Sequence, residues 1–529
     1  MRRTHALAIA LSLGAMSACD SLLEADLPYL LTDAAIQGAN TAETQVNSIQ
    51  ALFECGISSF GWVGMGHEDV FESVAGVAGG AHVFVNAANT GLCGDADTDQ
   101  SWFDQIMGAR ALISTDPAKL EATGLGLGAG VYDKIVGEYN LGAAGERLAA
   151  ISAIYMAMSL DHFGEFYCEG AIDGSELMNG SEFLVLAEDW VGRALGHITT
   201  FGDFTMPNNV APSAQNMAIA LRAQIRWASG NLAGAATDAQ AVLAADPDFT
   251  AWITREAGVT RRNRVFQAGG SPTRAGFSGM LGINDWWNGA VRPPNPVTGV
   301  LWPQVIPFTG YIFLGVLPDG RTLDAGNIPV RWAAEDRDGA EQPVPLANGA
   351  VADTRVLTHF ASIQGPEKRE IPDKYSDDAD DMPYLSWRQL TLILAEWENI
   401  TNNDQAGAIA FVNTLRTAHG LPTISGAYLT TLTDGTNDQN EVRYMLFEES
   451  RREFFAEGVG RFWAVKIKNT DIAWFPRRQG QTPANGYNLQ GGVRLHFPSS
   501  EYTNNPILNA GGGLALRGTG CPVAEAPLP

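Results

Sequence analysis

The chain has 529 residues, of which 45 % are hydrophobic and 18 % are charged, and its formal net charge is −25. This composition is typical of a folded globular protein, and the length is sufficient for two or more packed units. A chain this acidic is not expected to bind nucleic acid through its general electrostatic field.

The N-terminus has the pattern of an export signal, because a basic start precedes a short apolar run, Ala6 to Leu13. The small residues from Gly14 to Cys19 (GAMSAC) resemble a bacterial lipobox, in which the cysteine thiol is acylated, for example with palmitate. We therefore expect a signal peptide over 1–18, a lipid anchor at Cys19 and a tether over 19–32. An ordinary cleaved signal with an incidental cysteine is the alternative.

Four further cysteines follow: Cys55, Cys93, Cys168 and Cys521. An exported chain meets an oxidising compartment, so an even number of cysteines predicts disulfides. Three pairings are open, and the sequence does not choose among them. The absence of a Cys-x-x-Cys pair or a Cys/His cluster argues against a zinc site.

Apolar residues at spacings of three and four predict a helix from Glu146 to His162, closed by Gly164. The same periodicity predicts helices over 214–229 and 232–245, joined by a Gly-Asn turn. This pair resembles a tetratricopeptide-type helical hairpin, although no 34-residue period runs along the chain.

The middle of the chain differs in composition, because residues 292–383 hold 12 of the 26 prolines. This composition predicts long irregular loops with a few short strands. Long loops on a rigid scaffold often carry binding sites.

Helices are expected to resume at Tyr384, with one apolar face that includes Trp387 and Trp397. Asn402 or Asn403 can cap the next helix, which Gly420 and Pro422 end. A third helix is expected from about Asn440 to Glu457, and the tail beyond Ile467 is again rich in loop-forming residues.

The segment 384–463 resembles the SusD/RagB family of surface nutrient-binding lipoproteins. The family's Leu-x-x-Ala-Glu helix is matched by Leu392 to Glu396, and its Asn-x-x-Arg helix before a Gly-Leu turn is matched by Asn413, Arg416, Gly420 and Leu421. Its Arg-Arg-Glu helix and following turn are matched by Arg451, Arg452, Glu453, Phe454, Glu457, Gly458, Arg461 and Phe462. The family's acidic residue before the paired arginines is replaced by Ser450.

The resemblance implies a mostly α-helical SusD-like fold with tetratricopeptide-like hairpins and a loop-rich middle region. A single domain is expected over 33–529, with helical scaffold at about 140–250 and 384–463 and an insertion at about 260–383. The resemblance also implies binding without catalysis. The expected partners are an oligosaccharide or peptide ligand, a SusC-like TonB-dependent barrel transporter, and the outer membrane through lipid alone.

Three carboxylates, Glu449, Glu453 and Glu457, lie four residues apart on one helical face. Such a group could include a catalytic acid pair. However, Arg452 lies three residues after Glu449, which favours ion pairing within the helix and keeps the carboxylates ionised. We therefore interpret this face as structural.

Alternating aspartates in CGDADTDQ, which are Asp95, Asp97 and Asp99, resemble the start of a calcium loop. Position six is Gln100 rather than glycine and position twelve is Ile106 rather than glutamate, so an EF-hand is excluded. We expect no cofactor. A looser calcium site stays open as the alternative, here and at Asp377, Asp378, Asp380 and Asp381.

Adjacent tryptophans, Trp286 and Trp287, lie in a loop rich in turn-forming residues, beside Asn284 and Asp285. A tryptophan face is large, rigid and apolar, so it can stack on the CH face of a sugar while neighbouring amides and carboxylates bond its hydroxyls. We predict a ligand site there, with core packing of the tryptophans as the alternative. The weaker candidates are Trp62, Trp102, Trp302 and Tyr311, together with Phe60.

Two other functional classes stay open. A secreted glycan-active hydrolase would need two carboxylates facing each other across a cleft, and no motif indicates such a pair. A helical-repeat scaffold that binds only proteins would show no saccharide or peptide binding.

Cell fractionation tests the predicted anchor. The intact chain should sediment with the outer membrane and should be degraded by protease added to whole cells, whereas Cys19→Ala should leave the membrane fraction. An aspartate after the lipidated cysteine favours inner-membrane retention in some bacteria, so Asp20 makes the inner membrane the alternative location. Protection from protease in intact cells would contradict surface exposure.

Overall fold

The computed structural model describes residues 38–68, 71–73, 101–116, 129–257, 261–266, 281–283, 311–313, 315–316, 322–323, 350–352, 354–356, 358–362, 368–421, 423–424, 439–469, 494–495 and 497–521. The predicted signal peptide and tether lie outside these residues. Within them, no helix is both long enough and apolar enough to cross a bilayer.

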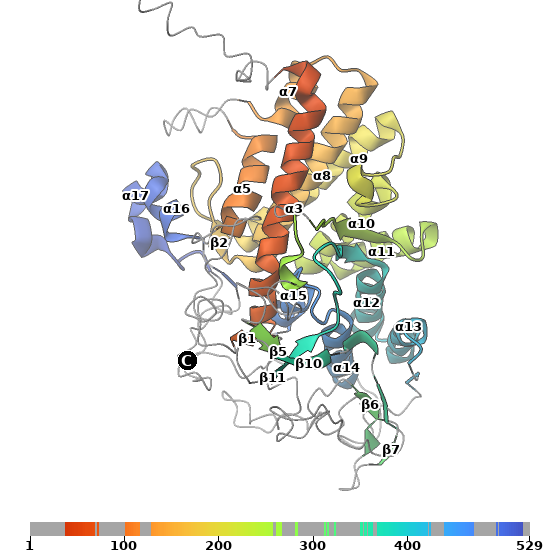
Figure 1. The fold of residues 1–529 in the computed structure, drawn as a ribbon. Helices are drawn as coiled ribbons and strands as arrows, with labels where there is room; N and C mark the ends of the chain where they lie inside the picture. Colours follow the sequence, from red (N-terminus) through yellow and green to blue (C-terminus); the bar gives the residue numbers. More distant parts are fainter. Residues whose placement is uncertain are drawn as a thin grey trace, which may run out of the picture.

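The first half of the chain forms a helical bundle around one central helix (Figure 1). After the short turn η1 (Ala39–Thr41), its helices are α3 (Ala42–His67), α5 (Ser101–Ile113), α7 (Val131–Gly137), α8 (Ala143–Phe166) and α9 (Gly180–Phe201). Every residue of α8 from Leu148 onward is buried, because α3, α5, α7, α9 and α10 all pack against this helix. Helix α8 therefore occupies a core position, and it buries a few charged residues there, such as Asp161 and Glu165.

The predicted helix at 146–162 is confirmed, but its predicted end is wrong. Helix α8 continues through Gly164 to Phe166. A Cβ atom on Gly164 would lie 2.7 Å from the Leu184 side chain and 3.0 Å from the carbonyl oxygen of Gly180. This glycine therefore permits close approach of α9 and does not terminate the helix.

The predicted hairpin is confirmed as α10 (Ala214–Ala228) and α11 (Leu232–Ala245). Ser213 and Asn231 cap the two helices through their side chains, and Gly230 makes the turn at φ +87°. Strand β4 (Thr250–Ile253) then pairs antiparallel with β12 (Met382–Ser386), which joins this hairpin to the later helices.

The C-terminal helices are α12 (Trp387–Trp397), α13 (Gln405–Ala418), α14 (Gln439–Glu453) and α15 (Arg461–Lys468), with a π-helical turn, η6 (Glu398–Asn402), after α12. The predicted start at Tyr384 is wrong, because residues 382–386 pair with β4 and Ser386 caps α12. The predicted cap of α13 is also wrong, because Asp404 accepts the bond from Gly407 while Asn403 has a left-handed backbone.

The remaining described strands form short antiparallel pairs. They are β1 (Phe71–Ser73) with β5 (Leu281–Ile283), β2 (Glu169–Gly170) with β3 (Met178–Asn179), β6 (Tyr311–Phe313) with β9 (Ala350–Ala352), β7 (Gly315–Val316) with β8 (Thr322–Leu323), and β10 (Thr358–Ser362) with β11 (Lys368–Pro372). The 3-10 turn η5 (Thr354–Val356) lies between β9 and β10. The prediction of short strands in the middle of the chain is confirmed for its described residues.

The C-terminal segment, made of α16 (Ser499–Asn504), α17 (Pro506–Gly511) and η7 (Gly513–Leu516), is fastened to the end of α8. Cys168 and Cys521 form a disulfide across 353 residues of sequence. The buried carboxylate of Glu169 accepts bonds from the Tyr502 hydroxyl at 2.6 Å and from the Gly520 amide at 2.6 Å. Of the other predicted cysteines, Cys55 is free and Cys93 lies outside the described residues.

A matched pair of glycine variants tests the packing of α8 against α9. Gly164→Ala should destabilise the fold by about 1–3 kcal/mol, because the added methyl group overlaps Leu184. Gly192→Ala, on the open face of α9 where a Cβ meets no atom within 4 Å, should stabilise it by about 0.5–1 kcal/mol. Urea unfolding of both variants measures the difference, and equal stabilities would contradict the close contact.

Candidate functional site

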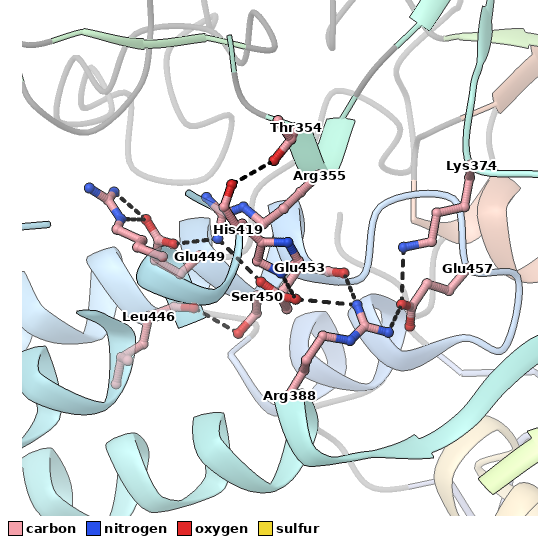
Figure 2. Close-up of polar contacts among 11 residues, drawn as sticks. Thr354, Arg355, Lys374, Arg388, His419, Leu446, Glu449, Ser450, Glu453 and Glu457 are labelled. Atoms are coloured by element: carbon pink, nitrogen blue, oxygen red, sulfur yellow. Dashed lines mark hydrogen bonds and ion pairs between the residues drawn. The ribbon is translucent and has the colours of Figure 1, made fainter. Parts of the chain in front are cut away.

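A buried network of ion pairs surrounds the three carboxylates that the sequence places on one helical face (Figure 2). Glu449 and Glu453 lie on α14, and Glu457 lies just after it. The exposed fractions of their side chains are 0 %, 0 % and 3 %. Carboxylates buried to this degree must be paired or neutralised, because desolvation penalises the charged form.

Glu449 pairs with two arginines from other parts of the chain. The Nε atom of Arg416, on α13, lies 3.0 Å from its Oε1, and Nη1 of Arg355, in η5, lies 2.7 Å from its Oε2. The intrahelical partner predicted for Glu449, Arg452, is not the residue that neutralises it. The ion pairs therefore join α14 to α13 and η5 instead of stabilising α14 alone.

Glu453 has three cationic or donor partners. Arg388 lies 3.2 Å away, Arg355 lies 3.3 Å away, and Nε2 of His419 lies 2.8 Å from Oε1. Figure 2 shows these groups converging on Glu453 from α12, η5 and the end of α13.

Glu457 completes the network. Its Oε1 accepts from Nζ of Lys374 at 3.2 Å and also pairs with Nη2 of Arg388, while its backbone carbonyl accepts from the Tyr375 hydroxyl at 2.7 Å. Because Lys374 and Tyr375 follow β11, these contacts fasten the end of the loop-rich middle region to the helical scaffold.

The network keeps Glu449 and Glu453 ionised. Burial alone would raise the pKa of Glu449, but the charges of Arg416 and Arg355 hold the pKa below its ordinary value. Burial likewise opposes ionisation of Glu453, yet the His419 hydrogen bond and the charges of Arg388 and Arg355 lower its pKa to about 2. A carboxylate with such a pKa cannot deliver a proton near neutral pH, so this cluster holds the fold together, as its interpretation as a structural face predicts.

The sequence identifies only part of this network. Arg416 and the three glutamates stand out in the motif of α13 and α14, whereas Arg355 and Lys374 lie in a region with no helical periodicity. No sequence signal links Arg355 to Glu449, since 94 residues separate them.

The main predicted ligand residues lie outside the described residues: Asn284, Asp285, Trp286, Trp287 and Trp302, as does the predicted anchor, Cys19. Trp62 lies on α3 and Tyr311 lies on β6, and only the backbone of these two residues is described. They therefore stay predictions.

Trp102 is a correction to the predicted site. Its side chain lies in the core with 2 % of the residue exposed, and its indole N–H donates to the Tyr167 hydroxyl at 2.9 Å. Phe60 is fully buried and stacks on Trp463 with ring centroids 5.7 Å apart. Neither ring presents a face to a ligand, because both fill the space between α3, α5, α8 and α15.

The acidic run near 377–381 shapes its own loop. Asp380 accepts the backbone amide of Asp377 at 2.9 Å, and Asp381 accepts the amide of Arg255 at 2.6 Å. Among the residues that the structure describes, no group of three His, Cys, Asp or Glu side chains could hold a metal ion. The aspartates at 95–99 lie outside those residues.

Among the comparisons with known proteins, only the comparison of structures finds matches, and these concern the fold of the chain. No family model matches the chain, and no curated protein matches its sequence. A solved structure from Bacteroides vulgatus, described as a candidate sugar-binding protein, is similar over 89 % of this chain and 97 % of its own, with a TM-score of 0.50 at 11 % identity. The chain has a SusD-like fold.

Two further solved structures are similar over comparable shares of the chain. NanU of B. fragilis matches over 90 % of this chain and 98 % of its own, with a TM-score of 0.49 at 13 % identity. A SusD-like carbohydrate-binding protein from B. vulgatus matches over 82 % and 83 %, with a TM-score of 0.48 at 13 % identity. The fold class expected from the motifs at 384–463, mostly α-helical and SusD-like, is confirmed.

Removing one carboxylate tests the SusD-like scaffold's dependence on the network. Glu453→Gln should destabilise the fold by about 3–5 kcal/mol at pH 7, because it leaves buried arginines without their counter-charge. The control is Asp189→Asn, which removes an exposed pair with Arg193 and should cost under about 0.5 kcal/mol.

The cost of Glu453→Gln should also depend on pH. The folded-state pKa of Glu453 is about 2, below its unfolded value, so its stabilisation is complete above about pH 4.5 and is lost as the pH falls towards 2. Urea titrations of the unmodified chain and of Glu453→Gln across this pH range measure the gap between their free energies of unfolding. A gap that does not narrow on acidification would contradict an ionised Glu453.

Proposed function

We propose that this protein is a lipid-anchored protein of the outer-membrane surface that binds glycans or related oligomeric nutrients. It passes them to a TonB-dependent barrel transporter. The observation that carries the proposal is the SusD-like fold, which extends over 89 % of the chain in the comparison with the candidate sugar-binding protein.

Two sequence features support the membrane part of the proposal. The lipobox-like stretch ending at Cys19 provides a site for acylation, and the polar residues after it provide a tether. A soluble body attached in this way stays at the surface without entering the bilayer, where it can meet a large ligand and a membrane-embedded transporter together.

The ligand part of the proposal rests on the loop that holds Trp286 and Trp287. Stacking of a sugar ring on an indole face needs a flat apolar surface, and the edge of the ring needs hydrogen-bonding groups, which Asn284 and Asp285 provide. Ion pairs of Arg355 and Lys374 fasten the described part of the middle region to α14 and the turn after it, and loops carried by such a scaffold often form binding sites.

A glycan-active hydrolase is less well supported. The carboxylates that could have suggested a catalytic pair, Glu449 and Glu453, are buried, ionised and paired with arginines. Neither can alternate between acid and base during hydrolysis without first breaking its ion pairs.

A glycan array tests the ligand site. The unmodified protein should bind one class of oligosaccharide, and Trp286→Ala/Trp287→Ala should weaken that binding by about tenfold or more, because two stacking faces are lost. Trp252→Ala removes an exposed tryptophan from β4 and should leave binding unchanged. Unchanged binding in the double variant would refute the site, and absence of any saccharide or peptide binding would refute the function.

A further inference from the structure

A polar cavity of about 180 Å³ lies beside the ion-pair network. Its wall comes from η5, the residues after β11, the start of α12, the end of α13 and the end of α14. A single water needs roughly 10–15 Å³ of such space, so the cavity holds more than isolated solvent. Its polar lining suits a hydrated or charged ligand.

Cations outnumber carboxylates in the wall of this cavity. Arg355, Lys374 and Arg388 contribute three positive charges, whereas Asp373 and Glu453 contribute two negative ones. Behind the wall, Glu449 and Glu457 pair with these same cations, so the cavity presents cationic hydrogen-bond donors without a large positive charge.

Two of these cations keep donors that the network does not use. The Lys374 ammonium has three N–H groups and directs one to Glu457, and no other described residue accepts from it. Arg388 directs Nη1 to Glu453 and Nη2 to Glu457, which leaves Nε without an acceptor in the described part of the chain.

The surroundings of Lys374 undercompensate its charge. Burial lowers the pKa of its ammonium, with Arg388 acting in the same direction, and Glu457 offsets only part of this effect. An additional negative group near Nζ would favour the charged form further. In Figure 2, Lys374 and Arg388 both point to Glu457, and His419 bonds to Glu453; Lys374, Arg388 and His419 all line the cavity.

We propose that this cavity binds a small oxyanion through Lys374 and Arg388, either a carboxylate of an acidic sugar or a sulfate group. Charge-assisted hydrogen bonds from an ammonium and a guanidinium suit planar and tetrahedral oxyanions alike. The Thr354 side chain, which donates to the His419 carbonyl at 3.1 Å, lies on the same wall and can contact a ligand hydroxyl. This site is separate from the ligand site proposed at Trp286 and Trp287.

Titration calorimetry of the full chain at low salt tests the site, with glucuronate, sulfate and uncharged glucose as probes. At least one anion should bind, and Lys374→Gln should weaken that binding by about tenfold. Lys374→Arg, which keeps the charge, should retain it. Tighter binding of glucuronate than of sulfate identifies a sugar acid as the ligand, and the reverse order identifies a sulfate group.

The matched control is Lys468→Gln. Lys468 has a similar exposed side-chain fraction, 24 % against 20 %, and a similar ion pair, 3.0 Å to Glu396, but it lies outside the cavity. Its variant should bind the anions normally. Repeating the titration with Trp286→Ala/Trp287→Ala separates the two proposals, because anion binding should survive loss of the aromatic site.

A measurement on the unmodified chain covers the case in which Lys374→Gln does not fold. The imidazole resonances of His419, assigned with His419→Gln, should shift when sulfate or glucuronate is added and should not shift with glucose. The proposal is overturned if neither anion gives heat or a shift at millimolar concentrations, or if Lys374→Gln folds and binds as the unmodified chain does.

Discussion

Burial of the α14 carboxylates is the constraint on which the rest of the C-terminal scaffold depends. Glu449 and Glu453 have no exposed side-chain surface, and their desolvation is tolerable only while Arg355, Arg388 and Arg416 are all in place. Those arginines come from η5, α12 and α13. The correct position of α14 therefore requires three other elements to be folded first or together with it.

The same arrangement occurs elsewhere in the fold. The buried Glu54 carboxylate on α3 accepts from Arg255 at 3.3 Å and Arg261 at 3.1 Å, some 200 residues later in the chain. Glu165 on α8 pairs with Arg461 on α15 at 3.0 Å. In each case a glutamate on a helix in the interior meets an arginine from a distant element. Such pairs add little net stability, but an incorrect docking would leave a buried charge unpaired, so they favour one arrangement over others.

The helices could be predicted from the sequence because their signals are local. Apolar residues at helical spacing and the turn residues that follow them place α8, α10 and α11 to within a few residues, from the predictions 146–162, 214–229 and 232–245. The predicted helix boundaries are wrong where contact with a segment distant in sequence determines the local structure. The strand at 382–386 exists because β4 pairs with it, and Gly164 continues the helix because α9 needs the space. Trp102 could not be placed from sequence, since a tryptophan near a loop looks the same whether it faces solvent or core.

The charged network was likewise predictable only in its local part. The spacing of Glu449, Glu453 and Glu457 indicates one shared face, and the interpretation of that face as structural agrees with the observed ion pairs. The identity of the partners depends on tertiary structure, since Arg355 and Lys374 follow no periodic pattern. Local spacing thus predicts that charges are grouped, whereas only the packed fold specifies which charges neutralise them.

The disulfide between Cys168 and Cys521 has a consequence for the order of assembly. The end of the most buried helix, α8, is secured by residues that are synthesised 353 positions later. Glu169, beside that cysteine, likewise remains without its Tyr502 and Gly520 donors until the same late segment arrives. Contacts of such long range form slowly and late. The end of α8 can therefore reach its final set of contacts only after a segment 353 residues later in the chain has been synthesised.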